Sequence, residues 1–174
     1  MAALPAFLKK RAQRSLAYLL REAEAVSPKD AFRFRRDDWP DQKWGIGQDG
    51  SIAGIVYHVA AWKQLTLPIL APHGKALSRG DFDPETAPSP TDWAAVCHWL
   101  RQVGTKWNAA VDALPDAEFD ATREWEGGSE ITLTDYIIEM IQHDVQHAAQ
   151  IEYLRQFYST GLRETQHNPC AEIP

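Results

Sequence analysis

Three histidines have the residue type and the spacing to bind a metal ion. His143 and His147 are four residues apart, which on an α-helix places both imidazoles on one face, one turn from each other. His58 lies in a separate apolar segment, three residues after Ile55 and four before Trp62, so it projects beside the apolar face of that segment. If the two segments pack together, three imidazoles converge. A site with no fourth protein ligand leaves positions open for water or substrate.

The histidine pair alone is weak evidence for a metal, because histidines at this spacing also occur as ordinary core or surface residues. A plain helical bundle with ordinary histidines therefore stays open as an alternative. Burying three neutral imidazoles without partners would cost on the order of a few kcal/mol, and a metal removes that cost. Asp144, Gln146 and Gln150 are near enough in sequence to orient the ligand rings.

Neighbouring residues argue against two other classes of metal site. The zincin pattern requires a glutamate directly after the first histidine, and Asp144 stands there instead. Carboxylate di-iron bundles need Glu-x-x-His on two helices, but the match from Glu164 to His167 falls in the C-terminal tail. His73, in a segment rich in helix breakers, and His98, on a predicted helix, are interpreted as bystanders.

Length and composition indicate one globular domain. The chain has 174 residues, of which 44% are hydrophobic and seven are tryptophans, enough to bury a single core. We predict one domain over 1–174, with a helical core over about 4–160 and a polar tail over 161–174. The tryptophans fill the core or line a pocket for an apolar ligand, and both alternatives predict that they are buried.

Charge and hydropathy bear on partners and location. The net charge of −6 opposes phosphate backbones, and the basic residues form no stripe, so we expect no nucleic-acid binding. No apolar stretch approaches about 18 residues and no secretory signal is recognised, which predicts a cytoplasmic protein without membrane contact. Cys97 and Cys170 form neither a disulfide framework nor a zinc signature, and Cys97 is interpreted as a small core residue.

Four segments carry apolar residues at spacings of three and four, which predicts amphipathic helices. The segments are 4–25, 51–67, 91–114 and 132–160. Ser51 and Thr91 are predicted N-caps, and Thr132 with Asp135 has the form of a capping box. No segment alternates polar and apolar residues for long enough to suggest a sheet. The predicted fold is an all-α four-helix bundle with long inter-helix loops.

Two of the predicted loops are long. Residues 27–50 show no sustained periodicity but contain the aromatic residues Phe32, Phe34, Trp39 and Trp44. A loop of this size in a compact domain is usually a functional lid or a pocket wall. Residues 72–90 are too rich in proline and glycine to form a regular element.

Two motifs resemble those of one family, the DinB-like superfamily. Residues 51–62, from Ser51-Ile52-Ala53 through His58 to Trp62, resemble the second-helix motif of that superfamily. The residues His143-Asp144-x-x-His147, followed by small residues and Gln150, resemble its last conserved helix. The family often has glycine just before this glutamine, where the present chain has alanine.

The resemblance implies a DinB/YfiT-like four-helix bundle in which His58, His143 and His147 bind a divalent metal ion. Zinc or nickel is expected first, with iron or manganese as alternatives, because imidazole suits several of these ions. Characterised relatives include S-transferases that use bacillithiol, mycothiol or glutathione, and they are often dimers. The implied function is a metal-dependent thiol S-transferase that acts on a low-molecular-weight thiol and an electrophilic small molecule. The alternative is a non-catalytic bundle with a structural metal or a ligand-binding cavity.

Overall fold

The computed structural model describes residues 3–35 and 49–160, apart from the side chains of Arg79 and Glu126. Within this part of the chain the protein is mostly helical, which confirms the predicted fold class. The helices are α1 (Ala3–Glu24), α2 (Pro28–Ala31), α3 (Ile52–Thr66), α4 (Trp93–Ala113) and α5 (Leu133–Ser159). Two short strands, β1 (Thr122–Glu124) and β2 (Glu130–Thr132), pair as an antiparallel hairpin.

Side-chain caps mark where α3, α4 and α5 begin. The Ser51 hydroxyl accepts a hydrogen bond from Gly54 N at the start of α3, and Thr132 accepts one from Asp135 N at the start of α5, as predicted. The cap of α4 is Asp92, whose carboxylate accepts from Ala95 N, one residue later than the predicted Thr91. A carboxylate at this position also interacts favourably with the positive end of the helix dipole.

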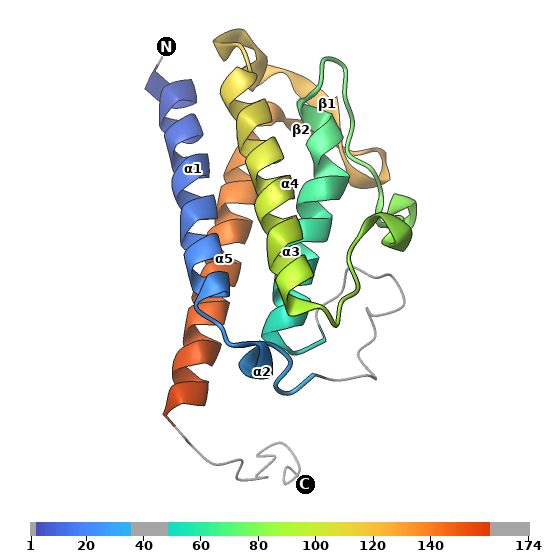
Figure 1. Cartoon of the computed structure of the whole chain (residues 1–174). Coiled ribbons are helices and arrows are strands. Elements are labelled where there is room, and N and C mark those ends of the chain that lie inside the picture. Colours follow the sequence, from blue (N-terminus) through green and yellow to red (C-terminus); the bar gives the residue numbers. More distant parts are fainter. Residues whose placement is uncertain (1–2, 36–48, 161–174) are drawn as a thin grey trace, which may run out of the picture.

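In the bundle of four long helices, each helix has one neighbour that runs in the same direction (Figure 1). Helix α1 packs on α4 and α5, and α3 packs on the same two helices, so α1 and α3 lie on opposite corners. Helices α1 and α5 run in one direction and α3 and α4 in the other (Figure 1). The connection from α3 to α4 therefore has to return along the whole bundle, which accounts for the length of the segment between Leu67 and Asp92.

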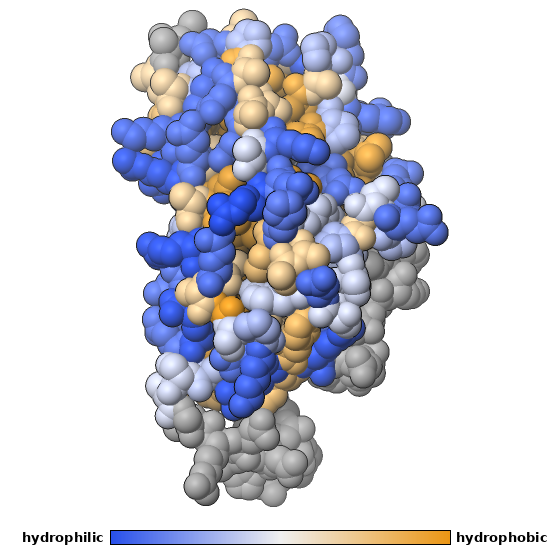
Figure 2. All heavy atoms as spheres, viewed as in Figure 1, coloured by the Kyte–Doolittle hydropathy of each residue, from blue (hydrophilic) through white to orange (hydrophobic). Residues whose placement is uncertain are grey.

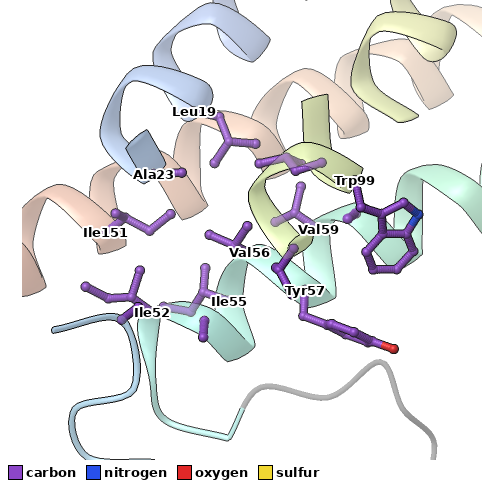
Figure 3. Close-up of a cluster of buried hydrophobic side chains, with 14 of the residues drawn as sticks. Leu19, Ala23, Ile52, Ile55, Val56, Tyr57, Val59, Trp99 and Ile151 are labelled. Atoms are coloured by element: carbon purple, nitrogen blue, oxygen red, sulfur yellow. The ribbon is translucent and has the colours of Figure 1, made fainter. Parts of the chain in front are cut away.

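The apolar core forms two clusters along the bundle. In the first, side chains from all four long helices point toward one another, among them Leu19, Val56, Trp99 and Ile151 (Figure 3). The second surrounds Trp107, Tyr136 and the start of α5. Fully burying one such large side chain contributes about 1.5–3 kcal/mol. The surface over α1 and α4 is mostly hydrophilic (Figure 2), so the apolar faces of these helices are turned inward.

A layer of buried polar side chains lies at the level where the two apolar clusters meet. Lys63 on α3 and Asp144 on α5 are both fully buried, and Lys63 Nζ lies 3.0 Å from each carboxylate oxygen of Asp144. Ser15 on α1 donates a hydrogen bond of 3.1 Å to Asp144, and the Lys63 ammonium lies 4.4 Å from the centre of the Trp107 ring on α4. The layer thus ties together all four helices of the bundle.

Some expectations from the sequence were wrong or lie outside the described residues. The polar segment before α5 contains the β1–β2 hairpin, although no sheet was predicted; strands of three residues are too short to show an alternating pattern. Helix α2 lies inside the predicted loop 27–50. Trp39, Trp44 and the predicted tail are outside the described residues. Within the described residues, no helix is long and apolar enough to cross a membrane.

Candidate metal centre

The packing of α3 against α5 brings the three predicted histidines together. His58 lies near the middle of α3, and His143 and His147 lie one turn apart on α5. His58 Nε2 is 3.2 Å from His143 Nε2, which is 3.1 Å from His147 Nε2. One ring nitrogen from each of the three lies within 4.8 Å of the other two. Ligands at right-angled to tetrahedral positions, with metal–nitrogen distances of about 2.0–2.1 Å, would be separated by about 2.8–3.4 Å, and two of the three nitrogen pairs have this separation.

A hydrogen bond fixes which nitrogen of His147 faces the other imidazoles. His147 Nδ1 lies 2.7 Å from the side-chain oxygen of Gln150, so Nδ1 carries the hydrogen and Nε2 presents a lone pair. If His143 Nε2 carries a hydrogen, the Nε2 atoms of His58 and His147 both compete to accept that one hydrogen. A cation among the three lone pairs satisfies all of them, and this pattern of a ligand ring held by an outer partner is typical of metal sites.

The electrostatic surroundings keep the central histidine neutral. Burial, together with the neighbouring His147, His58 and Lys63, lowers the pKa of His143 to about 2. Burial also lowers the pKa of His147, against the opposing effects of its hydrogen bond to Gln150 and of the Asp144 charge. His143 Nδ1 is buried and has no hydrogen-bond partner among the described residues. An unsatisfied group of this kind costs about 1–3 kcal/mol, and a metal bound at Nε2 would leave Nδ1 as it is.

A cavity of about 470 Å³ opens in front of the imidazoles. Its lining includes the half-buried tryptophans Trp62 and Trp125 and the exposed side chains Glu139, Gln142 and Gln146. Since these last three are exposed, the cavity reaches the protein surface. A small molecule could therefore approach the three histidines from solvent.

The residues suggested around the histidines have different roles in the structure. Gln150 contacts a ligand ring, as the sequence suggested, whereas Asp144 is paired with Lys63 in the core and Gln146 lines the cavity. His73 and His98 are exposed and stand apart from the cluster, which agrees with their interpretation as bystanders.

Cys97 is half-buried on α4, where it packs against the core. Burial raises the pKa of its thiol to about 11, so this residue is protonated at neutral pH and is a poor nucleophile. This agrees with its interpretation as a small residue of the core.

Sequence analysis missed Glu139 and Trp125 as parts of the site. Glu139 precedes His143 by one helical turn, so its place on the same side of α5 could have been inferred from helical spacing. Trp125 lies between β1 and β2, and no local pattern predicts where that hairpin packs. The prediction that all tryptophans are buried was wrong for Trp62 and Trp125, which are half-buried at the cavity.

The fold and the site together define a class: a four-helix bundle with a three-histidine candidate metal centre at the mouth of a cavity. The chain belongs to the DinB superfamily, whose family model matches residues 11–151. Its structure is similar to that of YfiT from Bacillus subtilis, with a TM-score of 0.62 and 15% sequence identity over 89% of this chain and 87% of that one. YfiT is described as a probable metal-dependent hydrolase with an unusual four-helix bundle topology. A search of curated proteins found no significant match.

Proposed function

We propose that this protein is a metal-dependent enzyme that joins a low-molecular-weight thiol, through its sulfur atom, to an electrophilic small molecule. His58, His143 and His147 would hold a divalent ion, and the cavity in front of them would receive the thiol. The observation that carries the proposal is the convergence of three imidazole nitrogens with N–N distances of 3.1–3.2 Å at a cavity that reaches the surface. The thiol itself is suggested by the family resemblance.

A divalent ion at this place would supply a Lewis acid that favours the thiolate form of a bound thiol. The thiol proton leaves to solvent at the exposed edge of the cavity. Sulfur forms a bond to the electrophilic carbon, and the bond from that carbon to its leaving group breaks with its electron pair. Gln150 holds His147 in the tautomer that presents Nε2, and the low pKa of His143 keeps its lone pair available across the neutral range.

The donor set restricts the metal to a group of ions. Three imidazoles without a carboxylate or thiolate suit zinc or nickel, with iron or manganese as further candidates. Three protein ligands leave positions for substrate or water, which is the pattern of catalytic rather than structural sites.

Two other functions compete with the proposal. Metal-dependent hydrolysis is favoured by the similarity to YfiT, since the same open positions could hold the attacking water. A non-catalytic protein that binds a structural metal or a ligand in the cavity is the second. An exchangeable water at the metal would argue against a structural metal, and product analysis with thiol and ester substrates would separate transfer from hydrolysis.

Elemental analysis of tag-free protein tests the metal centre itself. We expect near-stoichiometric divalent metal in the wild type and loss of metal in His143→Ala and in His58→Ala. His98→Ala is the matched control, because His98 is an exposed histidine outside the cluster. Absence of metal in the wild type, or equal metal in all four proteins, would contradict the proposal.

We also propose that the protein forms a homodimer through α5. The exposed residues of this helix from Gln142 to Ser159 are uncharged, with Val145, Tyr153 and Phe157 among them, and the partly exposed Arg155 is paired with Glu22. Depletion of charge is typical of the centre of homodimer interfaces. Light scattering on the purified protein measures the oligomeric state.

The predicted cytoplasmic location and the absence of nucleic-acid binding stay predictions.

A further inference from the structure

We propose that the cavity selects ligands that carry a positively charged group, such as an ammonium, close to the atom that binds the metal. The inference rests on the proposed function, because it describes the ligand of that same site. It is carried by the chemistry of the cavity wall: two indole rings and a carboxylate line the space in front of the histidines.

The two tryptophans provide faces that attract cations. Trp62 lies one turn beyond His58 on α3, with its ring centre 6.2 Å from that of the imidazole. Trp125 comes from the hairpin and is held by Tyr136, with ring centres 5.5 Å apart. Tryptophan is the aromatic side chain that binds cations best, with about 0.5–2 kcal/mol for each favourable contact. Two indoles from different elements thus line the cavity in which an ammonium group would lie.

The charged side chain in the cavity wall is negative, which is the sign that attracts a cationic group. Among the described residues that line it, Glu139 is the sole charged side chain, and it lies four residues before His143 on α5. This spacing corresponds to about 6 Å along the helix axis. A compact ligand that binds the metal through one atom would thus place its second group beside Glu139.

The surface beyond the cavity strengthens this preference. A second hollow shares Trp125 and Glu139 with the cavity and adds the carboxylates of Glu130 and Asp135. Lys63, a cation on the same helix as His58, is buried and paired with Asp144. A ligand group that extends from the metal site toward the hairpin therefore meets carboxylates, which attract a cationic group there, whereas the divalent ion attracts the anionic atom that binds it.

Three thiols of similar size but different charge test the inference. Thiocholine is cationic, 3,3-dimethylbutane-1-thiol is its neutral isostere, and 2-mercaptoethanesulfonate is anionic. Each is titrated at low ionic strength into protein loaded with Co²⁺, and binding is followed by the thiolate-to-cobalt absorption band. The affinities of wild type and Glu139→Gln are compared for each thiol separately, so that differences in thiol acidity cancel. Asp112→Asn is the control for net charge, because Asp112 is exposed on α4 and is not among the cavity residues.

We expect Glu139→Gln to weaken thiocholine binding about three- to five-fold, to leave the neutral thiol unchanged and to strengthen sulfonate binding, as removal of one exposed charge predicts. Asp112→Asn should leave all three affinities unchanged. Equal effects of Glu139→Gln on the three thiols, or none, would overturn the inference while leaving the metal centre intact. Failure of the wild type to bind Co²⁺ or to show any thiolate band would contradict the proposed function itself.

Discussion

Two polar clusters lie next to each other between the same two helices, and they differ in how their polar groups are satisfied. Lys63 and Asp144 are fully buried, and each charge has the opposite charge at 3.0 Å. His143, the residue before Asp144, is half-buried, and its Nε2 faces two other imidazoles in place of an opposite charge. The ion pair joins opposite charges within the protein, whereas the three imidazoles are placed to bind a cation.

The difference separates a structural role from a binding role. A buried ion pair holds helices in register, because neither charge tolerates the loss of its partner. Three imidazoles whose facing nitrogens carry more lone pairs than hydrogens are stabilised by a cation that binds between them. We infer that the ion pair sets the packing of α3 on α5, and that this packing brings His58 to the pair on α5.

The largest expected effect comes from breaking the ion pair. Lys63→Met should lower the free energy of unfolding by about 3–5 kcal/mol, because it leaves the Asp144 carboxylate buried without its counter-charge. Chemical denaturation of the wild type and the variant measures this. The double variant Lys63→Met/Asp144→Leu removes both charges and should recover most of the loss. A single variant as stable as the wild type would show that the layer is not the structural element inferred here.

A smaller effect is expected at the hydrogen bond that orients His147. Gln150→Ala should weaken metal binding about 10- to 100-fold, the usual effect of removing a group that holds a ligand ring, while the fold is retained. Competition with a metal chelator measures the affinity. Gln146→Ala, an exposed glutamine on the same helix, is the control and should change the affinity little. Equal losses in both variants would mean that Gln150 has no special role.

The smallest effect concerns the stability of the metal-free protein at mildly acidic pH. The folded-state pKa of His143 is lowered to about 2, whereas an unfolded histidine has a pKa of about 6.5. The unfolded state therefore binds the extra proton as the pH falls below about 6.5, and the folded state loses roughly 1 kcal/mol of stability per pH unit.

This pH dependence can be measured between pH 6.5 and 5, where the carboxylates remain mostly ionised. Denaturation curves of metal-free wild type should show the loss, and His143→Leu should show a flatter dependence because it lacks the titrating group. Identical slopes for the two proteins would contradict the low pKa of His143. Added metal should make the dependence steeper, since it keeps all three imidazoles unprotonated in the folded state while those of the unfolded state still bind protons.

The sequence by itself determined the local features. Ser51 and Thr132 cap helices at the predicted residues, and the four-residue spacing places His143 and His147 on one face of α5. Such features depend on groups within about four residues of each other along the chain. The apolar faces also predicted four packed helices, because each must be covered by another.

Tertiary structure alone decided the features that join distant residues. His58 and His143 are 85 positions apart, and their contact follows from the packing of α3 on α5. Lys63 would not be placed in a core from its type, since lysine is almost never fully buried unless it is paired, and its partner is 81 positions away. Trp125 reaches the cavity because the hairpin packs there. Contacts at these separations depend on the packing of the whole bundle, which no local pattern encodes.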